Sequence, residues 1–366
     1  LGAEVVLNQP DNGAGTVRRI HVITNGGPGP IGLLIPLVEA DTWLDTEATG
    51  LLTDPSGAVV GASFVRTDGS GEGFIAAGAV VVATGGFARD VARVIADRPG
   101  LAGVDFVAEA AHSTDGGGHG MLEALGVPLG GPGSQGVYVQ SIADLREPGS
   151  LEALWPTGLS TSVIVDSAGQ RQVDESQVGD LTRIDWLLAD PDKRLWAVMR
   201  EERLRVENAM VPAYNWAALG APESLSGDEV IEALSLSVYA SPGELAAGEG
   251  IDVDGLATTI VNYDVAAEAG VDPLGKDAMM MEPLGGHALL ALPLAPGAAK
   301  SFGGVSTTVS GAVLGGDGVV IPGLFAAGEV AGMLGTVDIG RGFAGSVTAC
   351  YLGGLIAGEA AAQQSR

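Results

Sequence analysis

The stretch from residue 321 to the C-terminus constrains the fold more than any other part of the chain. Residues 323–328 form a short apolar run closed by glycine, which predicts a buried strand. Glu329 follows at once, and a carboxylate at the exit of a buried strand is costly unless a partner, such as a ligand hydroxyl, binds it. A glycine-rich loop over 332–345 then leads into a small-residue helix predicted over 346–362. The pattern predicts a strand–loop–helix unit of an α/β domain, whose helix start attracts negative charge.

A second motif, Ala83-Thr84-Gly85-Gly86, closes a β-branched run that begins near residue 79. Its two glycines let the backbone approach a ligand without a Cβ in the way. A helix is predicted to begin soon afterwards, near Asp90. Upstream, three β-rich runs separated by turn sequences predict a three-stranded meander that leads into the strand before the motif. The three runs are 46–53, 59–65 and 74–77.

These motifs resemble one known family. IPGLFAAGE at 321–329, followed by GLIAGEAAA at 354–362, is similar to the C-terminal signature of FAD-dependent oxidoreductases of the fumarate reductase/succinate dehydrogenase flavoprotein type. That family includes members resembling 3-ketosteroid dehydrogenases. ATGGF at 83–87 fits the same family, and the resemblance covers about residues 30–366.

The resemblance implies an α/β fold, in which part of an FAD/NAD(P)-binding Rossmann-like flavoprotein domain carries an inserted α+β capping domain. The expected domains are residues 1–137 for the FAD-binding domain, 138–290 for the capping domain and 291–366 for the return to the FAD-binding domain. The family's strand–GxGxxG–helix, which binds the ADP half of FAD, is expected to precede residue 1. The chain is therefore expected to be N-terminally truncated, and whether it holds FAD without that segment stays open.

The resemblance also implies which residues bind FAD. Glu329 is expected to hold the ribityl chain, and the turn at Gly345 is expected to face the pyrimidine edge of the flavin. The Thr84 turn is expected to touch the adenosine–pyrophosphate side. A helix start at Asp115 is expected to face the flavin pocket, and Gly304 to lie beside the flavin ring. The cofactor-binding candidates are Ala83, Thr84, Gly85, Gly86, Asp115, Gly116, Gly303, Gly304, Gly328, Glu329, Gly345, Ser346 and Val347.

The expected capping domain carries two further family-like segments. Residues 163–175 are similar to a family hairpin in which Arg171 and Glu175 are kept, whereas Gln172 and Asp174 replace Phe and Asn. A second segment, from Tyr263 to Asp272, resembles the family's Tyr-Asn…Gly-x-Asp stretch. Helices are predicted over 186–207, 227–234 and 254–269.

Hydride transfer to or from a flavin needs anchors for the carbonyl or carboxylate of the substrate and a proton donor or acceptor that faces the ring. In fumarate reductases of the family, two His and two Arg fill these roles. Here Arg341 aligns with one of the four, and Lys300 is a possible substitute for another. The Tyr of the 3-ketosteroid dehydrogenases has no counterpart, but His287 lies nearby as a candidate base. The catalytic candidates are Arg341, His287 and Lys300; a surface ion pair for Arg341 and a structural role for His287 remain open.

The sequence therefore predicts an FAD-dependent dehydrogenase or reductase that acts on a C–C bond adjacent to a carbonyl or carboxylate by hydride transfer with flavin N5. The alternative is a non-catalytic or inactive flavoprotein-like fragment that cannot hold FAD. A third hypothesis is an NAD enzyme, because residues 27–32 match GxGxxG literally. It requires these residues to join a parallel strand to a helix at the centre of a sheet, and Pro30 removes an N–H where the pyrophosphate would bind.

Composition limits the possible partners. The chain has 366 residues and a net charge of −27, which argues against binding of nucleic acid or of anionic membrane surfaces. It shows no uninterrupted apolar run of about 18 residues, so no membrane span is expected. Cys350 is the single cysteine, which excludes a disulfide framework and fits a cytoplasmic location. The expected partners are a small unsaturated or carbonyl-activated substrate and an unknown electron acceptor or donor; no metal site is expected.

Overall fold

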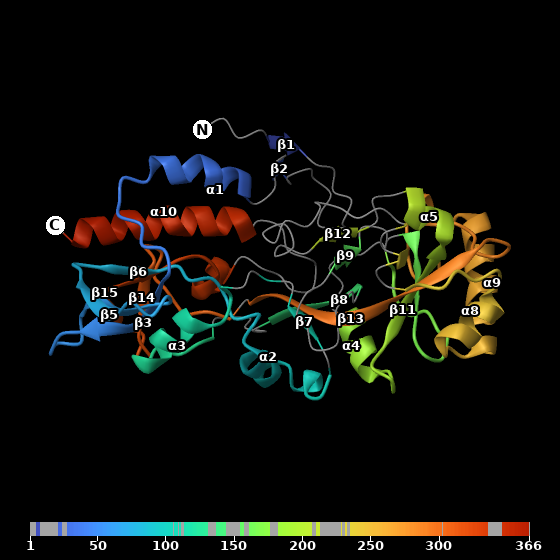
Figure 1. Cartoon of the computed structure of the whole chain (residues 1–366), viewed down its shortest axis with the longest axis horizontal. Helices are drawn as coiled ribbons and strands as arrows, with labels where there is room; N and C mark the ends of the chain where they lie inside the picture. The colour runs from blue at the N-terminus through green and yellow to red at the C-terminus, as the bar shows by residue number, and fades with distance from the viewer. Residues whose placement is uncertain are drawn as a thin grey trace. The chain divides into compact units, whose positions relative to one another are not determined.

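The computed structural model describes most of the chain (Figure 1). The described residues are 5–7, 21–23, 28–104, 106–108, 110, 113–130, 137–143, 154–156, 161–175, 182–206, 210–212, 228, 231–232, 235–301, 303–335 and 346–365. Contacts divide the chain into two compact units. Unit 1 comprises Leu1–Gly86, Gly116–Ser134 and Phe302–Arg366, and unit 2 comprises Phe87–Asp115 and Gln135–Ser301. The domain limits expected from the sequence, at residues 137 and 290, stay a prediction.

The predicted meander of unit 1 is confirmed. Strands β3 (Thr46–Thr53), β4 (Val59–Arg66) and β5 (Glu72–Ala76) pair antiparallel in that order. The first turn is held by Asp54, whose side chain accepts hydrogen bonds from the N–H groups of Ser56 (2.8 Å) and Ala58 (3.1 Å). Turn chemistry that was readable in the sequence therefore places these three strands.

The second sheet of unit 1 contains both predicted motif strands. Its order is β14 (Ala312–Leu314), β15 (Val320–Ala326) and β6 (Val80–Val82), with β15 parallel to β6. Helix α10 (Ser346–Gln364) packs against β15 and buries Ala357 and Ala361 there, so the predicted C-terminal helix is confirmed. The core between this sheet and helix α3 (Gly117–Ala124) consists of Val59, Val82, Leu122, Val127, Val305, Val313, Leu324, Ala326, Val330 and Ala331.

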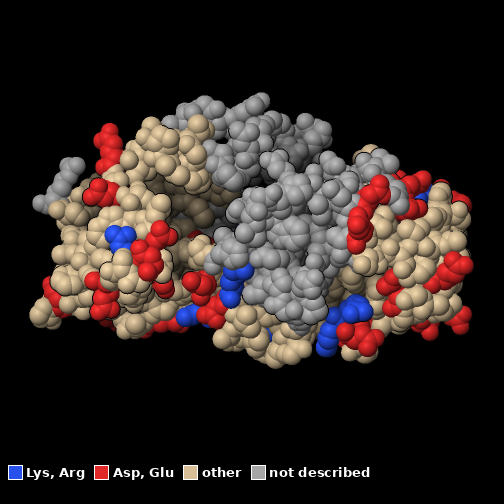
Figure 2. Space-filling model, in the orientation of Figure 1, with Lys and Arg blue, Asp and Glu red and all other residues tan. Residues whose placement is uncertain are grey.

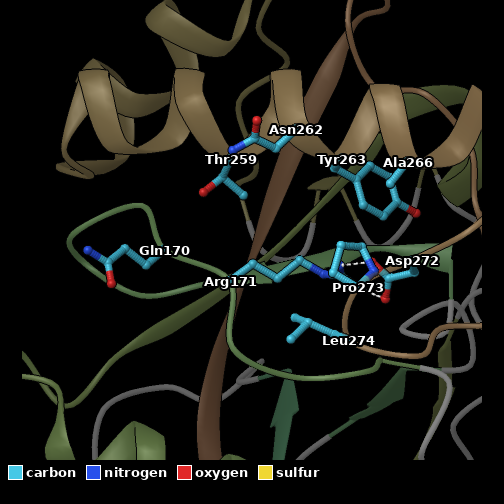
Figure 3. Close-up of a pocket in the computed structure, with 9 residues that line it drawn as sticks. All are labelled: Gln170, Arg171, Thr259, Asn262, Tyr263, Ala266, Asp272, Pro273 and Leu274. Atoms are coloured by element: carbon cyan, nitrogen blue, oxygen red, sulfur yellow. Dashed lines mark hydrogen bonds and ion pairs between the residues drawn. The ribbon is translucent and has the colours of Figure 1, made fainter.

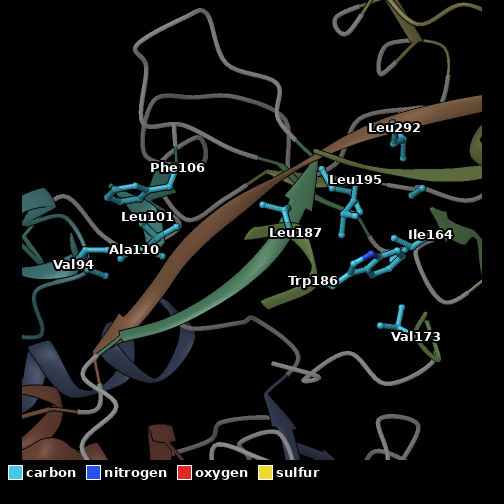
Figure 4. Packing of buried hydrophobic residues seen from close by; sticks show 14 of the residues in the cluster. Val94, Leu101, Phe106, Ala110, Ile164, Val173, Trp186, Leu187, Leu195 and Leu292 are labelled. Carbon is cyan, nitrogen blue, oxygen red and sulfur yellow. The ribbon is translucent and has the colours of Figure 1, made fainter. Parts of the chain in front are cut away.

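Unit 2 is built on one larger sheet. Its strands follow the order β10 (Val163–Val165), β11 (Leu195–Arg200), β13 (Leu289–Ser301), β8 (Val137–Ala143), β9 (Leu154–Pro156) and β12 (Met210–Pro212), with β7 (Val107–Ala108) beside β13. One hydrophobic core gathers residues of the sheet with those of helices α2 (Val91–Asp97) and α4 (Thr182–Ala189) (Figure 4). The other face of the sheet packs on helices α8 (Pro242–Glu249) and α9 (Val253–Ala269).

The predicted helix over 186–207 is wrong in its middle. Helix α4 ends at Ala189, strand β11 follows, and a short helix α5 (Glu201–Val206) comes after it. The reason lies in β11, where Leu195 and Ala197 enter one core while Trp196 and Val198 enter the other. A segment buried on both faces reads as a continuous apolar run, so the sequence lacks the alternation that marks a half-exposed strand.

The other two predicted helices of this region have different outcomes. Helix α9 is confirmed, with the Asp252 side chain capping its start through Gly255 N (2.7 Å) and Gly270 in the left-handed conformation at its end. Such caps are the usual start and stop signals of a helix. Of the helix predicted over 227–234, only Asp228 and residues 231–232 are described, and these are helical.

The literal GxGxxG match does not form a dinucleotide-binding unit. The strand before it, β2 (His21–Ile23), pairs antiparallel with β1 (Val5–Leu7) in a sheet of two strands. The residues of the match run into helix α1 (Pro28–Leu34), which is only seven residues long and is followed by a 3-10 turn. The NAD hypothesis required a parallel strand at the centre of a sheet, so it is wrong for the described strands.

Three further observations concern the described residues. None of the described helices is both long and apolar enough to cross a membrane. The described residues also contain no group of three or more His, Cys, Asp or Glu side chains that could hold a metal ion. Acidic side chains are spread over the described surface in Figure 2, with few basic ones between them.

Candidate functional site

The two motifs that carried the sequence analysis meet at one edge of the β14–β15–β6 sheet. Because β15 and β6 are parallel and Ala326 lies opposite Val82, both strands end at the same place. A hydrogen bond from Ala327 N to the carbonyl oxygen of Val82 (3.0 Å) continues the pairing beyond the strands. The Thr84 turn and Glu329 therefore leave the sheet side by side, at the carboxyl edge where α/β sheets bind their ligands.

A third predicted segment lies against the Glu329 turn. The turn continues as a 3-10 segment, η5 (Gly328–Gly335), and Val305 N donates a hydrogen bond to Val330 O (2.9 Å). A Cβ on Gly304 would come within 3.0 Å of Val330 O and of Gly332 N, both backbone atoms. The Gly303-Gly304 segment is therefore packed backbone to backbone on η5, an approach that only glycine allows.

The predicted helix start at Asp115 is also at this edge. Gly116, in the left-handed conformation, donates its N–H to Gly86 O (3.2 Å) and precedes α3. The first turn of α3 thus begins beside the Thr84 turn. A helix N-terminus presents free N–H groups and a partial positive charge, which suit a phosphate or another electron-rich group.

Not every predicted cofactor residue can be placed. Helix α10 begins at Ser346, and Val347 in its first turn is exposed. Gly345 and the side chain of Ser346 lie outside the described residues, and so does Arg341. The roles expected of them stay predictions. Cys350 faces Gly328, because a Cβ on that glycine would lie 3.7 Å from its Sγ, so α10 packs on the Glu329 turn.

The donor set at this edge fits FAD. Glycine at positions 85, 116, 304 and 328 keeps Cβ atoms away from four converging backbone segments, and three of these glycines adopt a positive φ. Ala83 and Thr84 are exposed at the turn, and the half-buried Glu329 supplies an acceptor for ligand hydroxyls. Backbone N–H groups, a helix start and one carboxylate are the groups needed to bind a phosphate-bearing ligand with a polyhydroxyl chain.

Two catalytic candidates lie at opposite ends of one strand. His287 precedes β13, and its Nδ1 lies 3.9 Å from Glu202 Oε1 in an exposed setting. Lys300 is near the other end, next to Ser301, whose Oγ accepts a hydrogen bond from Phe87 N (3.2 Å). At about 3.3 Å per residue the thirteen residues of β13 span roughly 40 Å, so His287 and Lys300 cannot act on the same substrate atom. The end of β13 that carries Lys300 lies beside Phe87, which directly follows the Gly85-Gly86 turn.

Comparison with known proteins now decides the family. A family model described as an FAD binding domain matches residues 17–343. The chain belongs to this family. Its cofactor is FAD, in agreement with the strand-edge geometry and with the predicted flavoprotein fold.

Similar proteins include fumarate reductase (cytochrome) of Shewanella frigidimarina, 25% identical over 97% of this chain. Urocanate reductase of Eggerthella lenta is 27% identical over 87% of the chain. The chain spans 58% and 50% of the lengths of these two proteins. The open conformation of a flavocytochrome c3 fumarate reductase superposes with a TM-score of 0.72 at 24% identity, covering 100% of this chain and 61% of that one. A 3-ketosteroid-Δ4-(5α)-dehydrogenase of Rhodococcus jostii RHA1 gives 0.61 at 24% identity, covering 90% and 62%. At these identities the two structures show a shared flavoprotein fold.

Unit 2 of this FAD binding domain protein holds a buried ionic cluster that joins the two family-like segments of the cap. Arg171 binds Glu175 through Nε (2.8 Å) and Nη2 (2.7 Å), and binds Asp272 through Nη1 (2.6 Å) and Nη2 (3.0 Å). Lys276 adds a second cation 3.3 Å from Glu175 Oε2, and its Nζ donates to Ser162 O (2.6 Å). The side chains of Glu175, Asp272 and Lys276 have no exposed surface. Sequence analysis noted the matching residues but gave no signal that they meet.

The aromatic ring of Tyr263 lies against both cations of the cluster. Arg171 Cζ and Lys276 Nζ are each 5.1 Å from its centroid, a distance at which cation–π attraction acts. Burial, helped by the charge of Glu175, raises the pKa of Tyr263 above its ordinary value, so the ring stays neutral. Burial also lowers the pKa of Lys276, against the attraction of Glu175. Two cations and two carboxylates balance to zero, so the cluster is an internally neutral structural element.

A pocket of about 320 Å³ opens beside this cluster (Figure 3). Arg171 crosses its floor, with Tyr263 and Asn262 of α9 on one side and Leu274 on the other. The residues that line it are Gln170, Arg171, Thr259, Asn262, Tyr263, Ala266, Asp272, Pro273 and Leu274. The guanidinium of Arg171 is already occupied by two carboxylates. None of the predicted flavin residues lines this pocket, so it is not the cofactor site that the sequence motifs predict.

The cluster predicts loss of stability in acid. Burial acts to raise the pKa of Asp272, but hydrogen bonds from Arg171 and from Lys276 N–H hold it below the ordinary 3.8. A carboxylate with a lowered folded-state pKa contributes stability that is complete above its unfolded pKa and is lost as the pH falls through the folded value. We expect the urea midpoint of unit 2 to fall steeply below about pH 4, and to vary less with pH in Asp272→Asn, which starts from lower stability. Equal pH dependence in both proteins would contradict this assignment.

Proposed function

We propose that this protein transfers a hydride between flavin N5 and a C–C bond adjacent to a carbonyl or carboxylate. The observation that carries the proposal is the meeting of the Thr84 and Glu329 turns at one sheet edge of an FAD binding domain protein. The named reactants of its relatives support the substrate class. Fumarate, acrylate and urocanate each hold a C=C bond conjugated to a carboxylate, and relatives that reduce them are 25–28% identical to this chain.

The chain's own residues have separate proposed roles around FAD and the substrate. Bound FAD supplies the two-electron hydride chemistry. Glu329 would accept hydrogen bonds from ribityl hydroxyls, and the glycine turns at Gly85 and Gly304 would let the backbone approach the cofactor. The start of α3 would favour a negatively charged part of the cofactor. Lys300 and Arg341 are the cations proposed to hold the substrate carboxylate or carbonyl, because a flavin reaction at a conjugated C=C bond gains from a cation where negative charge develops. A cytoplasmic location and an electron partner belong to the proposal as well.

The test is an FAD titration of the protein in its full encoded length. We expect the purified protein to be yellow, or to become so on reconstitution, with quenched flavin fluorescence and saturation at one FAD per chain. Anaerobic reduction of the flavin followed by addition of fumarate, acrylate, urocanate or a conjugated ketone should reoxidise it with one member of the panel. A protein that folds but retains no FAD would favour the non-catalytic alternative.

Glu329→Gln is expected to weaken FAD binding without unfolding the protein. A hydrogen bond to a charged group contributes about 1.5–3 kcal/mol, so the Kd for FAD should rise about 10- to 100-fold. Fluorescence titration measures the change. Glu359→Gln, which alters an exposed carboxylate on α10, is the matched control and should leave the Kd unchanged. Equal Kd values for both variants would remove Glu329 from the cofactor site.

A further inference from the structure

We propose that Gly118, which sequence analysis did not single out, is a positioning residue for the flavin site. It occupies the first turn of α3. A Cβ at this position would lie within 3.0 Å of both Oγ1 and Cβ of Thr84, and 3.1 Å from its Cγ2. Real Cβ atoms almost never show contacts this short, so the Thr84 side chain rests on bare backbone of α3. This inference rests on the proposed flavin function and assigns to it a residue of the helix start at Asp115 that is not among the cofactor-binding candidates.

The contact matters because of what it joins. Thr84 belongs to the turn that leaves β6, and Gly118 belongs to the helix whose start faces the same sheet edge. A hydrogen bond from Gly116 N to Gly86 O (3.2 Å) makes a second link between these two segments. Two links fix both the separation and the direction of the turn relative to the helix start. If either segment shifts, the backbone N–H groups of the two segments would no longer face the same part of bound FAD.

The same helix offers an internal comparison. Gly120, two residues further along α3, has no atom within 4 Å of the position where its Cβ would lie. An alanine there meets open space and removes a helix-weakening glycine, so it should be neutral or slightly stabilising. Position 118 tolerates no side chain while position 120 does. The requirement for glycine at 118 therefore comes from Thr84 and not from the helix.

The experiment is a double-mutant cycle read out by FAD affinity. Gly118→Ala, Thr84→Gly, the double variant and Gly120→Ala are each titrated with FAD in the full-length protein, and their melting temperatures are measured without FAD. All three clashing atoms belong to the Thr84 side chain, so Thr84→Gly removes them together. We expect Gly118→Ala to raise the Kd for FAD at least about tenfold when Thr84 is present and less than about twofold when it is added to the Thr84→Gly variant. Gly120→Ala should bind as the parent does.

Each outcome decides something. The inference is overturned if Gly118→Ala binds FAD as tightly as Gly120→Ala does. It is also overturned if adding Gly118→Ala to the Thr84→Gly variant raises the Kd for FAD as much as Gly118→Ala does in the parent protein. If Gly118→Ala lowers only the melting temperature and leaves the Kd unchanged, the contact is structural and the positioning role is wrong. If Gly118→Ala does not fold, recovery of folding and FAD binding in the double variant supports the inference. A parent protein that binds no FAD refutes the proposed function itself, which is a separate result.

Discussion

Replacing Arg171 with Met is expected to destabilise unit 2 by about 3–5 kcal/mol, because removing one partner from a buried ion pair leaves uncompensated charge behind. Arg171 makes four hydrogen bonds to Glu175 and Asp272, whose side chains have no exposed surface. After the change, only Lys276 would face two buried carboxylates. Denaturant unfolding followed by the fluorescence of Trp186 and Trp196, both buried in this unit, measures the loss.

Two companion variants separate charge from packing. Arg203→Met removes a partly exposed ion pair with Glu282 in the same unit, and should cost no more than about 1 kcal/mol. Combining Arg171→Met with Glu175→Gln and Asp272→Asn removes the stranded charges, and should restore part of the stability that Arg171→Met loses. A loss equal to that of Arg203→Met would show that the cluster contributes little. A triple variant weaker than the single one would assign the loss to packing.

The contacts within this cluster could not be predicted from the sequence, whereas parts of the fold could. The turn residues at Asp54 and the caps of α9 are local signals, so the meander and that helix were predictable. Arg171 and Asp272 are 101 residues apart, and no local rule says that such distant charges meet. Strand β11 was missed for a related reason, since its two apolar faces serve two separate cores that only the folded sheet defines.

The candidate flavin site was likewise predictable only in part. Glu329 and Gly85-Gly86 stood out as candidates because a carboxylate or a glycine pair directly after a strand has a local chemical meaning, and their role in binding FAD stays a prediction. Their meeting depended on β6 and β15 being parallel neighbours, which the structure supplies. The fold keeps His287 and Lys300 apart instead of bringing them together. Both were candidates for one reaction centre, yet they lie at opposite ends of one strand. The sequence did not predict that one continuous strand, β13, separates these two residues, so it gave no measure of the distance between them.

Gly304→Ala is expected to damage both the stability of unit 1 and its affinity for FAD. The new Cβ would come within 3.0 Å of Val330 O and of Gly332 N, which are backbone atoms that no rotamer change can move away. The segment cannot retreat freely either, because Gly304 O accepts a hydrogen bond from Gly130 N (3.0 Å) and Val305 N donates to Val330 O (2.9 Å). Overpacking of this kind costs about 1–3 kcal/mol, and the loss of either hydrogen bond adds about 1 kcal/mol.

The same displacement should reach the cofactor, because Val330 directly follows Glu329. Pushing η5 away from Gly304 moves the carboxylate proposed to hold the ribityl chain, so the Kd for FAD should rise by at least about tenfold together with the loss in melting temperature. Gly316→Ala is the matched control, since its Cβ would meet nothing closer than 3.7 Å and its backbone is not left-handed. If Gly304→Ala lowers stability but leaves the Kd unchanged, the segment only supports η5 and is not part of the cofactor site. If both quantities change and Gly316→Ala changes neither, one backbone contact links the packing of unit 1 to flavin binding.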